Sequence, residues 1–279
     1  MSYKTIVVHV DRSRHAPQRI RIAAELALRD NAHLTGVAMT GISRYLLEGD
    51  VVNQHEPVLV THLDYLRKEA EQALAQYEET VRRMGVLSWE KRLVDDEPAG
   101  GLSLEARYAD LVVMSQTDTS ESLPGIMSDF PEYVVMNAGR PVLLVPYAGE
   151  FTQLGRKVLL AWDGSMEASR AISGALPFLR HAADVKVVVF NAERQVNVHG
   201  EQPGADLALY LARHGVKVDV LQETTGQDSG NALLSLAADV NADLLVMGCY
   251  AHSRFREVLL GGATRTVLES MTLPVLMSH

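Results

Sequence analysis

The amino-acid sequence predicts an α/β protein made of two tandem doubly wound domains, each a five-stranded mainly parallel sheet with helices on both faces. Short apolar runs of the buried-strand type alternate with segments of helical periodicity, which favours parallel sheets. Several of these segments recur later in the chain, which indicates a duplicated unit. The chain has 279 residues, of which 47% are hydrophobic and 22% are charged, and this is enough for two ordinary globular domains.

The first half begins with a strand-like run and continues through alternating helices and strands. The segment from residue 40 to residue 56 shows no clear periodicity. A long helix with an apolar stripe follows it. The predicted elements are strands at 5–10, 34–39, 89–94, 111–114 and 142–145, and helices at 17–27, 63–77 and 102–108.

Two pairs of segments from the two halves match at one constant offset. The run Ala109–Met114 matches Ala242–Met247, and Arg140–Leu144 matches Leu273–Met277. Both matches have an offset of 133 residues, so no insertion separates the paired segments. The chain is therefore a tandem duplication.

The residues after the first strand of each half also match, but at a larger offset. Asp11 corresponds to Asp163, which lies 152 residues later. The first half therefore contains about nineteen extra residues, which we place between residues 40 and 66. The repeat predicts a first domain at residues 1–147 and a second domain at residues 156–279.

A glycine-punctuated loop follows the last but one strand of the second half. The strand at 243–247 ends at Gly248, and Gly261 and Gly262 open a helix that runs towards Ser270. Backbone without side chains can approach a ligand closely, and the free N–H groups and positive dipole end of a helix favour phosphate. The alternative for this stretch is a tight turn that only lets the helix and strand pack.

The first half lacks this cradle when it is aligned at the offset of 133 residues. Ser115 falls opposite Gly248, Asp118 opposite Ala251, Ser128 opposite Gly261 and Asp129 opposite Gly262. Two acidic side chains therefore stand where a phosphate would lie, and like charges disfavour an anion there. We expect the first domain to be a degenerate copy.

At these residues the chain resembles the universal stress protein family in its tandem two-domain form. Nucleotide-binding members of that family carry an Asp at the end of the first strand and a Gly-x2-Gly-x9-Gly-Ser/Thr loop after the fourth. Here the corresponding residues are Asp163 and Gly248-x2-Ala251-x9-Gly261-Gly262. Ala251 replaces a glycine of the family pattern, and Gly262 replaces its hydroxyl residue.

The resemblance implies a stress-response protein that binds ATP or a related adenine nucleotide in its second domain, with or without Mg²⁺ and with at most slow ATP hydrolysis. Asp163 would accept a hydrogen bond from the adenine, and the backbone at Asn191 would lie against the base. The residues implied to line the ribose and triphosphate are Gly248, Ala251, Gly261, Gly262, Ala263 and Thr264. The resemblance also implies an intramolecular pseudo-dimer, with a homodimer as a further option.

Two alternatives stay open at the level of the sequence. Asp163 could instead cap a helix that begins near Met166, for which Ser165 is also a competent cap, and Asp11 is interpreted as a cap alone. For the whole protein, the alternative is a ligand-free protein-interaction module whose glycine-rich loop is only structural. The insertion at residues 40–66 would then supply a partner surface.

Charge and composition disfavour several other classes of function. The net charge of −9 and the lack of a basic run disfavour nucleic-acid binding. No signal-peptide pattern and no apolar run of about 18 residues is found, which predicts a cytoplasmic protein without membrane contact. The single cysteine, Cys249, cannot form an internal disulfide. The histidines lack the spacing of a strong zinc motif, and we assign no metal ligand and no catalytic residue.

Overall fold

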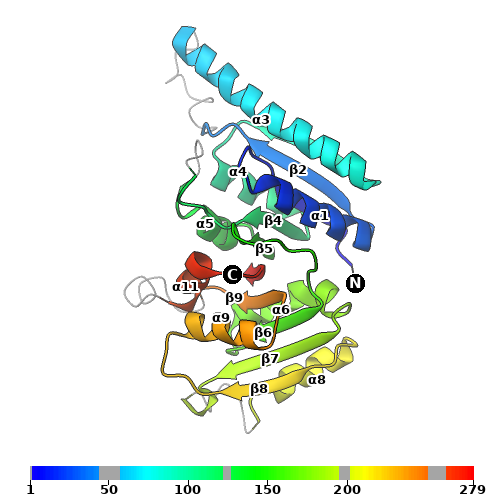
Figure 1. Cartoon of the computed structure of the whole chain (residues 1–279), viewed down its shortest axis with the longest axis vertical. Helices are drawn as coiled ribbons and strands as arrows, with labels where there is room; N and C mark the ends of the chain where they lie inside the picture. The colour runs from blue at the N-terminus through cyan, green and yellow to red at the C-terminus, as the bar shows by residue number, and fades with distance from the viewer. Residues whose placement is uncertain (1, 44–56, 122–126, 195–201, 251–261) are drawn as a thin grey trace. The chain divides into compact units, whose positions relative to one another are not determined.

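The computed structural model describes residues 2–43, 57–121, 127–194, 202–250 and 262–279. Contacts within the chain define two compact units, residues 2–142 and residues 143–279 (Figure 1). Each unit is a set of parallel strands with helices packed against them, which confirms the predicted α/β class. Among the described residues, no helix is both long enough and apolar enough to cross a membrane.

In the first unit, helices alternate with strands that pair in the order β3-β2-β1-β4, all in parallel. The strand β5 begins at the last residue of this unit. The elements are β1 Thr5–His9, α1 Ala16–Asp30, β2 His33–Met39, α3 Pro57–Met84, β3 Trp89–Val94, α4 Pro98–Glu105, the 3₁₀ turn η1 Ala106–Tyr108, β4 Leu111–Ser115, α5 Phe130–Asn137 and β5 Val142–Val145.

The second unit repeats this arrangement. Its strands pair in parallel in the order β8-β7-β6-β9-β10. The elements are β6 Lys157–Ala161, α6 Met166–Leu179, β7 Asp184–Phe190, the 3₁₀ turn η2 Ala192–Arg194, α8 Ala205–Arg213, β8 Asp219–Glu223, α9 Ser229–Asp239, β9 Leu244–Gly248, α11 Ala263–Ser270 and β10 Val275–Ser278.

The central strands are apolar throughout because helices cover both of their faces. Strands β4 and β5 are buried at every position, and so is β9 up to Met247. The outer strands β3 and β8 instead consist of partly or fully exposed residues, as expected at a sheet edge. In the first unit α1 packs on α3 and α4 packs on α5, with helices on both sides of the strands (Figure 1).

The insertion in the first half lengthens a helix. Helix α3 spans 28 residues, whereas its counterpart α8 spans 9, and α3 begins at Pro57 inside the predicted insertion. Tyr77 of α3 lies flat on β2, where a Cβ at Gly36 would come within 2.6 Å of its ring. The Tyr77 hydroxyl donates to the Leu34 carbonyl at 2.9 Å. The glycine in this strand therefore serves a close helix approach.

A carboxylate that recurs in both halves explains part of the sequence repeat. Asp110 accepts hydrogen bonds from the backbone N–H groups of Lys4 and Thr5, at 2.7 and 3.1 Å. Its counterpart Asp243 accepts from Gly155, Arg156 and Lys157 in the second unit. Each Asp therefore satisfies backbone donors where the first strand of its unit begins, and its role is structural.

The strand order places a crevice at the same point of each unit. The chain order reverses between β1 and β4 in the first unit and between β6 and β9 in the second. In open α/β sheets, ligands bind at the carboxyl ends of the strands on either side of such a reversal. Asp11 and Asp163 follow the first of these strands, and Ser115 and Gly248 end the second.

Candidate functional site

In the second unit, the carboxylate of Asp163 is exposed at the carboxyl end of β6. It accepts a hydrogen bond from the Ser165 N–H at 3.0 Å, and the Ser165 hydroxyl in turn accepts from the Ala168 N–H at 3.1 Å. Ser165 is therefore the cap of α6, and Asp163 only shapes the turn before it. Among the described residues, Asp163 has no salt-bridge partner, so its carboxylate is accessible to a ligand.

Gly248 lies where β9 meets the first turn of α6. A Cβ at this position would stand 2.4 Å from the Ala168 nitrogen and 2.7 Å from the Glu167 carbonyl carbon. Both are backbone atoms that cannot rotate away. Packing therefore requires a glycine here whether or not a ligand is present. This supports the alternative that Gly248 serves only a tight turn between strand and helix.

Asn191 follows β7 in the left-handed region, with φ of 52°. Its side-chain oxygen accepts from the Thr225 N–H at 2.9 Å, and its own N–H donates to the Glu223 carbonyl at 2.9 Å. The side chain thus ties the end of β7 to the loop after β8. The predicted contact with a base concerns the backbone at this residue and stays a prediction.

The helix that the sequence predicts after the glycine pair is α11, which begins at Ala263 with Gly262 in the N-cap position. No side chain caps this described end, and Gly262 and Ala263 are partly exposed. Thr264 is buried, and its hydroxyl accepts from the Tyr250 N–H at 3.3 Å. Its hydroxyl therefore anchors the start of the loop. Two predicted site residues, Ala251 and Gly261, lie outside the described residues.

In the first unit, the carboxylate that corresponds to Asp163 is held by an arginine. The Arg19 guanidinium forms a salt bridge with Asp11 and donates to the His9 carbonyl at 2.6 Å. It also donates to the hydroxyls of Ser13 and Ser115, at 3.2 and 3.1 Å. Arg19 is only 1% exposed, so this network occupies part of the crevice at the carboxyl ends of β1 and β4.

The interpretation of Asp11 as a helix cap is wrong. Helix α1 begins at Ala16 with His15 in the N-cap position, and no side chain caps it. Asp11 instead accepts from the Ser13 N–H and pairs with Arg19. Burial alone would raise the pKa of Asp11, but Arg19 and His9 outweigh it and hold the pKa well below its usual range.

The sequence analysis missed Arg19, although the repeat contains a signal for it. At the offset that pairs Asp11 with Asp163, Arg19 falls opposite Ala171, which is fully buried in α6. An arginine opposite a buried alanine, one position before the apolar Ile20, marks a charge that must find a partner inside the fold. The two halves thus differ at the residue beside their shared aspartate.

The described cavities of the first unit are small. One of about 290 Å³ lies beside Arg19, Ser115 and Asp118, and one of about 80 Å³ is lined in part by Leu66 and Ala70 of α3. Small-molecule sites usually have about 300–1,000 Å³. The smaller cavity lies well below this range, and the larger one, beside Arg19, lies at its lower end.

Asp118 does not repel anions in the way that the sequence suggests. Its carboxylate pairs with Arg14 and lies 2.9 Å from the His15 ring, whereas Asp129 is exposed before α5. Hydrogen bonds from Ser120, Arg14 and His15 hold the pKa of Asp118 well below its usual range. The charge of Asp118 is thus offset locally, and Arg19 is the stronger obstacle to a ligand in this unit.

His9 gives the first unit a predicted sensitivity to acid. Burial lowers the pKa of this histidine from 6.5 to about 4, although the nearby Asp11 acts in the opposite direction and Arg19 adds to the lowering. The unfolded chain therefore binds the proton first, and the free energy of unfolding should fall by about 3 kcal/mol as pH falls from about 6.5 to about 4. The contribution of Asp11 to the free energy of unfolding is lost only at lower pH, below about 4.

Urea unfolding at about pH 7 and about pH 4.5 measures this loss in the wild type and in His9→Gln, which is neutral at both pH values. The variant should lose about 2–3 kcal/mol less than the wild type over this interval. Equal losses in the two proteins would show that His9 is not kept neutral by its burial.

The comparisons with known proteins cover nearly the whole chain. The profile described as "Universal stress protein family" matches residues 2–146 and again residues 155–279. A universal stress protein of a Synechocystis species is 25% identical over 260 residues, which is 88% of this chain and 83% of that protein.

Solved structures show the same fold. The crystal structure of a universal stress protein from Archaeoglobus fulgidus superposes with a TM-score of 0.71 at 16% identity, covering 98% of this chain and 95% of that one. At this identity the likeness concerns the fold alone. The residue-level site therefore has to be argued from this chain itself.

Proposed function

The chain belongs to the universal stress protein family, and we propose that it is a stress-response protein whose second domain, residues 156–279, binds ATP or a related adenine nucleotide. We take residues 1–147 as a degenerate domain without a nucleotide. The observation that carries this proposal is that two corresponding carboxylates differ in exposure and in ion pairing. Asp163 is exposed and shapes only a turn, whereas Asp11 is held by the buried Arg19.

The second unit offers a plausible chemistry for the two ends of a nucleotide. Asp163 would accept from the adenine amino group at the carboxyl end of β6. Strand β9, which pairs with β6, leads into the loop that returns at Gly262. The described start of α11 has backbone N–H groups without a side-chain cap, and such a helix end attracts phosphate. Mg²⁺ would accompany the phosphates rather than require ligands of its own.

A second candidate, the ligand-free interaction module, has one specific observation in its favour. Packing against α6 already explains the glycine at position 248, and the Thr264 hydroxyl is bound to the loop backbone. These two residues therefore do not distinguish a nucleotide site from a structural turn. The exposed carboxylate of Asp163 favours the nucleotide site, because it accepts from the Ser165 N–H but has no ion-pair partner among the described residues.

Calorimetric titration of ATP into the wild type and Asp163→Ala tests the proposal. We expect the variant to bind about 1–3 kcal/mol more weakly, which is about 5- to 150-fold in the dissociation constant, because it loses contacts to the base alone. Asp219→Ala is the matched control, since Asp219 is an exposed carboxylate at the opposite, amino end of β8. It should bind ATP as the wild type does.

Circular dichroism of each variant provides the control for folding. If folded Asp163→Ala binds ATP as tightly as the wild type, the base does not lie at the end of β6. If the wild type itself shows no heat and no competition at millimolar ATP, the interaction module becomes the better description.

A further inference from the structure

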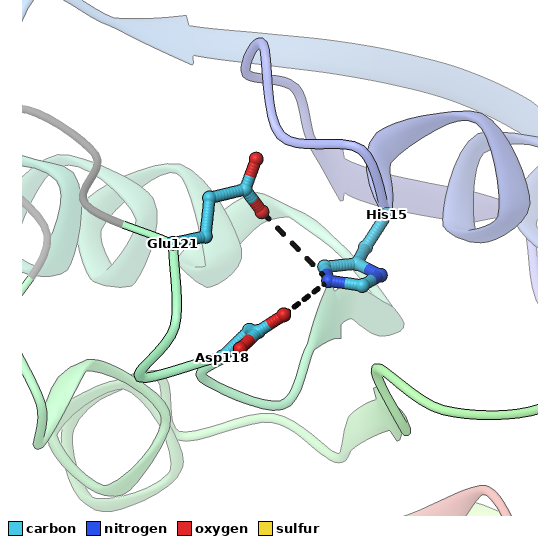
Figure 2. Close-up of side chains that lie close together, drawn as sticks. All are labelled: His15, Asp118 and Glu121. Carbon is cyan, nitrogen blue, oxygen red and sulfur yellow. Dashed lines mark hydrogen bonds and ion pairs between the residues drawn. The ribbon is translucent and has the colours of Figure 1, made fainter.

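Three side chains that can bind a metal ion converge in the first unit. His15 stands at the N-cap of α1, and Asp118 and Glu121 follow β4 (Figure 2). The His15 Nε2 atom lies 2.9 Å from Asp118 Oδ2 and 3.7 Å from Glu121 Oε2. All three ligand atoms lie within 4.8 Å of one another. Atoms of one Zn²⁺ shell, each about 2.0–2.2 Å from the ion, have similar separations.

The hydrogen-bond polarity at His15 Nε2 is inconsistent. With a proton this atom would donate to Asp118 Oδ2 at 2.9 Å, whereas with a lone pair it would accept from the Arg14 Nε–H at 3.2 Å. One ring nitrogen carries either a proton or a lone pair, so it cannot do both. A cation between His15, Asp118 and Glu121 would remove the conflict, because the lone pair and both carboxylates would then point at a positive charge.

Glu121 supplies a second, independent sign of a missing ligand. Its Oε2 atom is inaccessible to solvent and has no hydrogen-bond donor among the described residues. The other oxygen, Oε1, accepts from the Arg14 N–H at 3.1 Å, which fixes the direction of the carboxylate. Burying a carboxylate oxygen without a partner costs free energy. The unsatisfied oxygen faces His15, so a cation held there would satisfy it.

The site is open to solvent through a cavity, and the Arg14 guanidinium that occupies it can move away. All three side chains line the cavity of about 290 Å³, which would hold the water molecules that complete a coordination shell. Arg14 now pairs with Asp118, but the Arg14 side chain is 63% exposed, whereas that of Asp118 is 7% exposed. An incoming ion could displace Arg14 into water without disturbing the fold.

The second half does not repeat these ligands. At the offsets of the repeat, His15 falls opposite Glu167, Asp118 opposite Ala251 and Glu121 opposite Arg254. Two of the three ligands in the second half are thus replaced by residues that cannot bind a cation. The set belongs to the half in which Arg19 pairs with the first-strand aspartate.

We propose that His15, Asp118 and Glu121 bind one divalent transition-metal ion in the first unit. One imidazole with two carboxylates suits Zn²⁺ or Mn²⁺ better than Mg²⁺, which prefers oxygen ligands alone. The site is independent of the nucleotide proposed for the second domain. The sequence did not suggest it, because 103 residues separate His15 from Asp118.

Equilibrium dialysis of the full chain against Zn²⁺, without nucleotide, tests the site, with bound metal counted by mass spectrometry. The wild type should retain one Zn²⁺ per chain. Glu121→Gln and His15→Ala should each bind at least about tenfold more weakly, since removal of even an outer-shell partner typically costs about 10- to 100-fold. Arg14→Ala should bind more tightly than the wild type, because it removes the competing cation.

His33→Ala is the matched control. His33 lies 3.6 Å from Glu90 in the same unit and forms a histidine–carboxylate pair without a third ligand. It should retain Zn²⁺ as the wild type does, whereas loss of Zn²⁺ from this variant would place the ion at the His33–Glu90 pair. Glu121→Gln keeps the size of the side chain, so it decides the question even if His15→Ala fails to fold. No retained Zn²⁺ in the wild type, or unchanged retention in folded Glu121→Gln, would overturn the proposal.

Discussion

Replacing Arg19 with methionine should destabilise the first unit by about 3–5 kcal/mol, which is the usual cost of leaving one partner of a buried ion pair alone. The Arg19 side chain is 2% exposed and that of Asp11 is 16% exposed, so the variant would leave a largely buried carboxylate without its counter-ion. The His9 carbonyl and the Ser115 hydroxyl would lose their donor as well. Methionine replaces the aliphatic part of the arginine side chain, so the change concerns mainly charge and hydrogen bonds.

Urea unfolding of the wild type, Arg19→Met and the double variant with Asp11→Asn measures this effect. Removing both charges should restore part of the stability, because no buried carboxylate is then left without a counter-ion. If Arg19→Met is as stable as the wild type, the network does not hold the crevice closed. If the double variant is no more stable than Arg19→Met, the hydrogen bonds to His9 and Ser115 matter more than the ion pair.

Replacing Gly248 with alanine should destabilise the second unit by at least about 3 kcal/mol, at the upper end of the cost of overpacking. The added Cβ would meet the backbone of Ala168 at 2.4 Å, and relief would require a shift of α6 away from β9. Gly226→Ala is the matched control in the same unit, since a Cβ there would meet nothing within 4 Å. It should stay within about 0.5 kcal/mol of the wild type.

The midpoint of urea unfolding compares these two glycine variants. A stable Gly248→Ala would show that α6 yields easily and that packing does not require this glycine. Close approach of a ligand to the backbone would then be the remaining explanation for the glycine, as the family pattern implies. The measurement thus separates the two explanations of one residue.

The fold could be predicted from the sequence because its signals are local or repeated. Strand β3 occupies Trp89–Val94, the range predicted from the sequence, and α1 extends the predicted 17–27 to Ala16–Asp30. Parallel strands buried on both faces read as continuous apolar runs, which are distinctive. The repeat supports these predicted elements, since the same pattern occurs twice at one offset.

The network of the first crevice could not be predicted because its contacts are not local. Arg19 meets Ser115 across 96 residues, and periodicity places Arg19 only on a helix. The role of Asp11 was misjudged for the same reason, since a residue before a helix is first read as its cap. Glycine patterns carry a further ambiguity. A glycine at position 248 is compatible with close approach of a ligand or of α6, and the sequence does not distinguish the two.

We propose that the nucleotide binds in the second domain alone, and photoaffinity labelling with an azido-ATP can locate it. The full chain is labelled with and without excess ATP, digested, and its labelled peptides are mapped by mass spectrometry. We predict ATP-protected label only in peptides from residues 156–279, including the segments that contain Asp163 or Asn191. ATP-protected label in peptides from residues 1–147, around Asp11 and Arg19, would show that the first domain binds the nucleotide.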